Sequence, residues 1–242
     1  MPAGNNPTSG AVGRSVTTQR QSSIDFFFDP ICPFAWMTSR WVVQVAGLRG
    51  VDVTWRFIAL RILNADKDYA TDFPPGYDQL HTAGLRMLRV AAAVRAASGN
   101  EAVGEFYRAA GESLWNRDPE PAGMLRTDAG TEAHLVEVLD VAGLDASLAA
   151  AVGDENFDEI ISAETELALS RTGRDVGTPI ITFSPPDGSS FFGPVISRLP
   201  GDDEAVALWE AVETLAGFAP FAELKRSLRS MPDLPVLRGF GT

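Results

Sequence analysis

The segment Asp29-Pro-Ile-Cys-Pro33 holds the residue with the clearest chemical potential, because Cys32 is the only cysteine in the 242-residue chain. One cysteine cannot form a disulfide within the chain, so it would act as a nucleophile or join an external thiol in a mixed disulfide. A lone cysteine is otherwise most often a small buried apolar residue. The Cys-Pro placement at a predicted helix start favours the reactive interpretation.

The surroundings of Cys32 predict a helix N-terminus. Residues 24–28 form an apolar run typical of a buried strand, and Asp29-Pro30 ends it. Pro33 suits the first helical position, and a helical pattern follows to about residue 46. Free N–H groups and the dipole at a helix start stabilise a thiolate, so we expect the pKa of Cys32 to lie well below the ordinary value of about 8.5.

The rest of the chain predicts a sheet interrupted by a helical block. Residues 51–58 alternate and are β-branched, which predicts a strand that completes a parallel βαβ unit. Residues 77–173 carry helical periodicity with a break at Gly99. Strand patterns return at 177–183 and 190–192, and two further helices are predicted at 202–215 and 220–230.

This order of elements predicts an α/β fold, a four-stranded thioredoxin-like core (βαβ followed by ββα) with an all-α helical insertion before the third strand. Residues 24–76 and 174–230 are assigned to the core, and residues 77–173 to the insertion domain. Residues 1–23 are predicted to be a disordered tail, and residues 231–242 a C-terminal extension.

Thr178-Pro179 is the second place where chemistry is expected. In a thioredoxin-like core, a proline that is usually cis begins the strand facing the redox cysteine, and Pro179 occupies that place. The cis geometry rests on the fold resemblance, because only about 5–6% of X–Pro bonds are cis. Taken alone, Pro179 could simply begin a strand.

Several sequence blocks together resemble one family. They are Asp25-Phe-Phe-Phe-Asp-Pro-Ile-Cys-Pro-Phe-Ala-Trp36, Thr38-Ser-Arg-Trp41, Leu60 with Ile62-Leu-Asn64, Val176-Gly-Thr-Pro179, Phe191-Phe-Gly-Pro-Val195 and Phe221-Ala-Glu-Leu-Lys-Arg226. They closely resemble the DsbA-like mycothiol-dependent nitroreductases of actinobacteria over about residues 23–226. The resemblance implies a cytoplasmic thiol-dependent oxidoreductase with Cys32 as its nucleophile and a low-molecular-weight thiol, mycothiol, as its cofactor.

The chain departs from the family motif at Ala35, where the family has a second cysteine. A dithiol resolves its own mixed disulfide, whereas Cys32 needs an external thiol, so a monothiol cycle with a small-molecule thiol and a small-molecule substrate is expected. Two alternatives stay open. One is a kappa-class glutathione transferase or 2-hydroxychromene-2-carboxylate isomerase, which keeps a single active-site Ser or Cys. The other is a redox-inactive thiol-binding protein.

The resemblance also implies a cleft that binds the thiol and the substrate. Its expected lining comes from the start of the helix, from the proline segment and from two further family positions: Pro33, Phe34, Ala35, Asn64, Tyr77, Thr178 and Pro179. Alternative structural roles are packing for Phe34 and Tyr77 and capping of a turn for Asn64. Backbone groups at Thr178 could serve a bound thiol as an edge strand serves a peptide.

Composition and motifs exclude several other classes. The net charge of −12 argues against nucleic-acid and anionic-membrane partners, and no apolar run is long enough to span a bilayer. His81 and His134 are far apart and expected at the surface, so no metal site is predicted. No flavin or nicotinamide fingerprint is found. Whether the chain forms a homodimer stays open.

Overall fold

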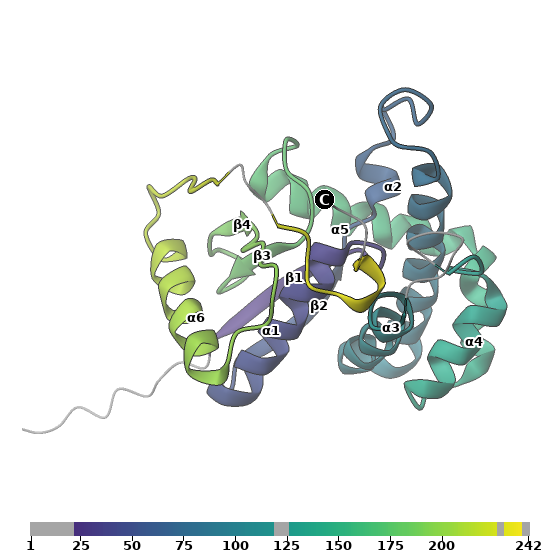
Figure 1. Cartoon of the computed structure of the whole chain (residues 1–242), viewed down its shortest axis with the longest axis horizontal. Coiled ribbons are helices and arrows are strands. Elements are labelled where there is room, and N and C mark those ends of the chain that lie inside the picture. The colour runs from purple at the N-terminus through teal and green to yellow at the C-terminus, as the bar shows by residue number, and fades with distance from the viewer. Residues whose placement is uncertain (1–21, 119–125, 227–229, 239–242) are drawn as a thin grey trace, which may run out of the picture.

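The computed structural model describes residues 22–118, 126–226 and 230–238 (Figure 1). The predicted N-terminal tail lies outside the described residues except for Ser22 and Ser23, and Ser23 already belongs to the first strand. Within these three ranges, no helix is long and apolar enough to cross a membrane.

A four-stranded sheet forms the centre of the core, as the sequence predicts. Its order is β2 (Asp52–Phe57), β1 (Ser23–Phe28), β3 (Ile180–Phe183) and β4 (Ser190–Phe192). β1 runs parallel to β2, with Phe26 opposite Trp55, and antiparallel to β3, with Phe26 opposite Ile181. β3 and β4 form the antiparallel hairpin. The fold class is therefore confirmed as α/β with a thioredoxin-like core.

Alternating side chains of β1 bury both faces of this sheet. Ile24, Phe26 and Phe28 face the larger apolar cluster, which includes α1 (Pro33–Arg49) and α6 (Asp202–Ala216). These two helices meet through Trp41 and Trp209, whose ring centroids are 5.5 Å apart. Phe27 points the other way and packs with Ala168 of α5 (Asp158–Thr172). The first strand and helix are thus fixed from all sides by apolar burial.

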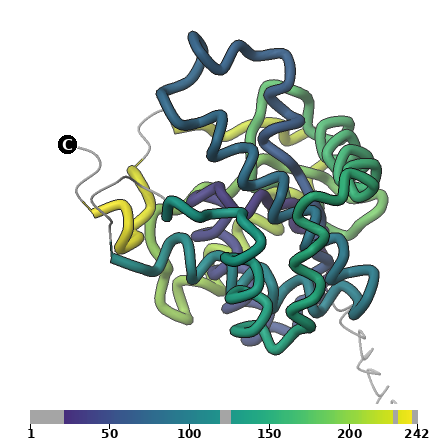
Figure 2. The backbone as a smooth tube through the Cα atoms, turned by 90° about the vertical axis from the view of Figure 1, so that its right-hand side faces the viewer, coloured from purple at the N-terminus to yellow at the C-terminus, as the bar shows by residue number. Residues whose placement is uncertain are grey.

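After β2 comes the short α2 (Leu60–Leu63), in the part assigned to the core, and then the helical insertion with α3 (Tyr77–Trp115), α4 (Glu132–Val141), η1 (Ala146–Gly153), η2 (Glu155–Phe157) and α5. Figure 2, turned by 90°, shows these helices in front of the core. Gly99 has φ 84° and breaks α3 where the sequence predicts a break. Tyr107 of α3 stacks on Phe28 of β1 at 3.9 Å, so aromatic packing joins the insertion to the sheet.

A buried carboxylate also joins the insertion to the core. Glu164 of α5 accepts hydrogen bonds from Arg56 and Arg95, both at 2.9 Å, and from the backbone N–H of Phe57 at 2.9 Å. Arg56 and Phe57 belong to β2, and Arg95 belongs to α3. Three elements therefore converge on one side chain that is almost fully buried.

Replacing Glu164 with alanine should lower the free energy of unfolding by about 3 kcal/mol, because two arginines and a backbone N–H lose their acceptor. Urea denaturation measures the change. Glu166→Ala is the matched control, since Glu166 lies on the exposed face of the same helix and pairs there with Arg174, which follows the helix. The control should cost less than about 1 kcal/mol. Equal losses in both variants would contradict a structural role for the buried network.

Two groups of sequence predictions are wrong. Residues 221–226 are not helical, although a last helix was expected at 220–230; residues 227–229 lie outside the described residues. Only Phe221 of this segment packs on the core, against Phe191, while Leu224 is 83% exposed, and short helices with little packing are marginal in water. His81 and His134 are buried, not at the surface.

Hydrogen bonds explain how these histidines are tolerated inside. His134 Nδ1 accepts from the N–H of Gly130 at 3.1 Å, and its Nε2 lies 2.9 Å from Ser113 Oγ. His81 Nδ1 lies 2.7 Å from the hydroxyl of Tyr69. Burial lowers the pKa of both imidazoles to about 4, so they are neutral at pH 7.

The C-terminal segment folds back onto the molecule. Leu234, Val236 and Leu237 are buried, and η3 (Pro235–Leu237) packs beside α3. Figure 1 shows this yellow segment passing between the core and the helical insertion. The expected C-terminal extension is therefore, over residues 231–238, part of the packed structure.

Candidate active site

Cys32 is the N-cap residue of α1. Its backbone is extended, and its Sγ accepts a hydrogen bond from the N–H of Ala35 at 3.5 Å. The backbone N–H of Cys32 donates to the carbonyl of Asp29 at 3.0 Å, which closes the turn between β1 and α1. Pro33 occupies the first helical position, where a missing N–H costs nothing. The local sequence therefore fixes the thiol at the helix start, as predicted.

The segment before β3 faces this thiol. Cys32 Sγ donates to the carbonyl oxygen of Thr178 at 3.5 Å, across 146 residues of sequence. The Thr178–Pro179 peptide bond is cis. The hydroxyl of Thr178 donates to the carbonyl of Phe27 at 3.3 Å, which anchors the segment to β1. A backbone carbonyl and an N–H group thus converge on one sulfur, an arrangement that suits a thiol or a mixed disulfide.

The ionisation of Cys32 differs from the sequence prediction. Burial of the thiol raises the pKa of Cys32 to about 12, the N–H of Ala35 opposes this rise, and the charge of Asp29 adds to it. The side chain is only 7% exposed. The prediction of a lowered pKa is therefore wrong for this structure, because loss of hydration outweighs the hydrogen-bond donors at the helix start. The thiol is protonated at pH 7 in this closed arrangement.

Asp29 is a site residue that sequence reasoning missed. Its buried carboxylate accepts from the N–H of Ile31 at 3.2 Å and from the N–H of Leu60 at 2.8 Å. It thereby ties the cysteine turn to α2. Gly84 of α3 covers it closely, since an added Cβ would lie 2.5 Å from its oxygen. An acidic residue three positions before the cysteine is the available signal, but in the sequence Asp29-Pro30 is also typical of a residue pair that ends a strand.

Burial raises the pKa of Asp29 to about 7, and the N–H groups of Leu60 and Ile31 oppose the rise. Between pH 4 and 7 the folded protein therefore binds a proton that the unfolded chain has released. The contribution of Asp29 to the free energy of unfolding should therefore fall as pH rises through this range, by about 4 kcal/mol, while the two buried histidines contribute in the opposite direction.

Asp29→Asn removes this titration, so the stability of the wild type relative to the variant should decline from pH 4 to 7. Urea denaturation at several pH values measures it. Loss of a hydrogen-bond acceptor adds an offset that does not depend on pH. Asp203→Asn, at the exposed start of α6, is the control and should follow the wild-type curve. Parallel curves for the wild type and Asp29→Asn would contradict the buried titration.

The remaining predicted site residues lie at different places. Ala35 is fully buried beside Cys32, and Phe34 is half-buried against the main apolar cluster. Asn64 follows α2, and its amide donates to the carbonyl of Leu60 at 2.8 Å. Tyr77 begins α3 and stacks on Phe73 with ring centroids 5.7 Å apart. In the described ranges, no hydrogen bond or ring contact joins Asn64 or Tyr77 to Cys32, so the structure leaves their binding roles untested.

Within residues 22–118, 126–226 and 230–238, no group of three or more His, Cys, Asp or Glu residues is arranged to hold a metal ion.

The site places a cysteine at the start of the first helix of a thioredoxin-like sheet, facing a cis Thr-Pro segment, an arrangement that suits thiol–disulfide chemistry. The chain belongs to the family described as mycothiol-dependent nitroreductase Rv2466c, whose model matches residues 31–226, about four-fifths of the sequence. The resemblance noted from the sequence is thereby confirmed. The chain is a thiol-dependent oxidoreductase that uses a low-molecular-weight thiol.

Individual proteins are similar to this chain in sequence or in fold. The uncharacterised protein Rv2286c of Mycobacterium tuberculosis is 29% identical over 223 residues, which cover 89% of this chain and 86% of that protein. The probable DsbA oxidoreductase SCO1869 of Streptomyces coelicolor shares the fold with a TM-score of 0.52 at 15% identity, covering 88% and 98% of the two chains. The cytosolic disulfide reductase DsbM of Pseudomonas aeruginosa has a TM-score of 0.51 at 18% identity, covering 80% and 100%.

Proposed function

We propose that Cys32 works in a monothiol cycle, in which one external thiol takes the part that a second cysteine plays in a dithiol enzyme. The observation that carries the proposal is the position of Sγ between the carbonyl of Thr178 and the N–H of Ala35. Ala35 stands where a dithiol motif has its second cysteine, so no second thiol of this chain lies beside Sγ. The family supports mycothiol as the thiol and the cytoplasm as the compartment.

The cycle has two exchange steps. The Cys32 thiolate attacks one sulfur of a substrate disulfide, so an Sγ–S bond forms, the substrate S–S bond breaks, and the leaving thiolate takes up a proton. An external thiolate then attacks the mixed disulfide, forms a new disulfide and returns Cys32 to the reduced state. Each step exchanges one S–S bond for another, and no further oxidant is needed.

Burial of Cys32 and its hydrogen bond to the Thr178 carbonyl both oppose formation of the thiolate. The protonated thiol donates to Thr178, and burial disfavours its charge. We propose that substrate entry separates Sγ from the Thr178 carbonyl and leaves the N–H of Ala35 as the donor to the thiolate. Pro33, Phe34, Ala35, Thr178 and Pro179 are proposed to line the thiol subsite.

Intact mass spectrometry tests this cycle. Incubation with an oxidised low-molecular-weight thiol should give a single adduct on Cys32, which excess reduced thiol should remove. Turnover with nitroaromatic and disulfide substrates, measured side by side with mycothiol, identifies the substrate class. An unmodified Cys32 would contradict the proposal and favour a redox-inactive binding protein. Conversion of a substrate without net thiol oxidation would favour the transferase or isomerase alternative.

Tyr77 is proposed to contribute to the substrate wall rather than to the thiol chemistry. Tyr77→Ala removes a half-buried ring at the start of α3, so the KM for substrate should rise about tenfold, the loss expected for one aromatic contact. The rate of Cys32 alkylation should stay within about twofold of the wild type. Tyr77→Phe keeps the ring and is the matched control. Equal effects of Tyr77→Ala on KM and on alkylation would argue against this role.

A further inference from the structure

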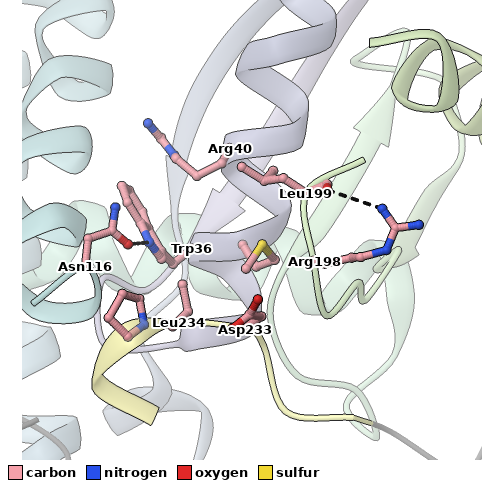
Figure 3. Close-up of a pocket in the computed structure, with 9 residues that line it drawn as sticks. Trp36, Arg40, Asn116, Arg198, Leu199, Asp233 and Leu234 are labelled. Carbon is pink, nitrogen blue, oxygen red and sulfur yellow. Dashed lines mark hydrogen bonds between the residues drawn. The ribbon is translucent and has the colours of Figure 1, made fainter. Parts of the chain in front are cut away.

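A cavity of about 390 Å³ lies along α1, beyond the reacting end of the helix. Arg40 is eight residues after Cys32, which corresponds to roughly 12 Å along a helix axis. Figure 3 shows the cavity walls, which come from α1, the end of α3, the segment before α6 and the C-terminal segment: Trp36, Met37, Arg40, Asn116, Arg198, Leu199, Asp233, Leu234 and Pro235. Neither Cys32 nor Thr178 lines it, so this space is separate from the proposed thiol subsite.

Arg40 brings an unneutralised charge to this cavity. Its Cζ lies over the indole of Trp36, 4.1 Å from the ring centroid, and its Nε donates to Ser39 Oγ at 3.2 Å. Its Nη2 is buried without a hydrogen-bond partner among the described residues, and no described carboxylate lies within 4.0 Å of it. Glu105 and Glu112, the nearest acids, both bind Arg108 instead.

The other charged groups of the cavity already have partners. Arg198 pairs with Glu204 at 2.9 Å, and Asp233 accepts from Arg238 at 3.5 Å. Neither provides a counter-ion for Arg40. Arg40 is half-buried and its guanidinium stays protonated, so it can bind an anion that enters the cavity.

Asn116 adds further donors next to Arg40. Its Oδ1 accepts from the Trp36 indole N–H at 3.2 Å, which directs its amide nitrogen away from that bond (Figure 3). Met37, Leu199, Leu234 and Pro235 supply apolar walls around this polar end. Around Arg40 and Asn116 the cavity therefore offers donors and apolar surface, while its one carboxylate, Asp233, pairs with Arg238; a ligand at the Arg40 end must supply acceptors.

We propose that this cavity is a binding site for a small organic carboxylate, with the carboxylate held by Arg40 and Asn116 and an apolar body packed against Met37, Leu199 and Leu234. An arginine N–H forms a charge-assisted hydrogen bond with a carboxylate, which is stronger than one between neutral groups. The volume suits a compact molecule, since small-molecule sites span about 300–1,000 Å³. The site goes beyond the proposed thiol chemistry and does not depend on it.

Isothermal titration of the full chain with sodium benzoate tests the site. Benzoate should bind with a Kd of about 1 mM or tighter, and neutral benzamide at least about tenfold more weakly, because a charge-assisted hydrogen bond is lost. Arg40→Met keeps the packing over Trp36 and should weaken benzoate binding at least about tenfold. Arg49→Gln, at the exposed end of the same helix, is the control and should leave it unchanged. Binding should also persist in Cys32→Ser, which separates this site from the thiol subsite.

Asn116→Asp is a second variant that tests the site if Arg40→Met is poorly folded. The new carboxylate can still accept from Trp36 and would supply an internal counter-ion to Arg40, so Tm should rise while benzoate affinity falls about tenfold or more. Three results would each overturn the proposal: no saturable benzoate binding to the wild type, equal affinities for benzoate and benzamide, or loss of binding in Cys32→Ser.

Discussion

Cys32→Ser should lower thiol-dependent turnover by at least about a thousandfold, because a serine hydroxyl can neither form a mixed disulfide nor ionise at pH 7. The change is nearly isosteric, and Ser Oγ can keep both the acceptor role toward Ala35 and the donor role toward Thr178. Structure and stability should therefore stay close to the wild type. Stopped-flow turnover with reduced thiol and substrate measures the loss, and circular dichroism checks the fold.

The outcome also separates the competing enzyme classes. Enzymes of the isomerase type can use serine at this place, so retained turnover in Cys32→Ser would contradict a cycle through a mixed disulfide. Ser39→Ala is a suitable control on the same helix, since the Ser39 hydroxyl donates to the carbonyl of Trp36 and takes no part in the proposed exchange. Its turnover should remain within about threefold of the wild type.

Ala35→Cys should convert the protein into a dithiol enzyme. Residues 32 and 35 are one helical turn apart, a separation that a disulfide can span, and the N–H of Ala35 already points at Cys32 Sγ. The resolving thiol would then be intramolecular, and effective molarities for such steps can reach about 10⁵ M. Turnover with disulfide substrates should rise at least about tenfold at low external thiol, and its dependence on that thiol should weaken.

Packing sets the cost of this substitution. Ala35 is fully buried, so an added sulfur should lower the free energy of unfolding of the reduced form by about 1–3 kcal/mol. Ala35→Ser adds a similar volume without redox chemistry and is the matched control. Intact mass after mild oxidation reports the new disulfide. If that disulfide forms and turnover does not rise, the oxidoreductase cycle is wrong and a transferase or isomerase assignment should replace it.

Local patterns were enough to predict the strand, cysteine and helix that form one half of the site. The aromatic strand, the Asp-Pro pair that ends it and Pro33 at the first helical position are all within a few residues of one another. These local signals are enough to place the strand end and the helix start. The meeting of Cys32 with Thr178 needed the fold resemblance, because 146 residues separate them.

The electrostatics of the site could not be predicted in the same way. A helix start favours the thiolate, but the larger effect is burial of the thiol in the main apolar cluster, which only the assembled structure defines. The same reason applies to Asp29, to the buried histidines and to Arg40. The burial and ionisation of each side chain depend on groups that are distant in sequence. The periodicity of apolar residues does not predict how far a given polar group is removed from water.

The position of the insertion has a consequence for synthesis of the chain. β1 lies between β2 and β3, so one edge of the central strand stays unpaired until residue 183 has been made. At about 5–20 residues per second, the 146 residues between Cys32 and Thr178 take roughly 7–30 s to appear. Throughout that interval the nascent thiol lacks its Thr178 cover, and the aromatic strand beside it offers an open edge for non-native pairing. Oxidation and aggregation of this protein should therefore be hazards of translation more than of the finished enzyme.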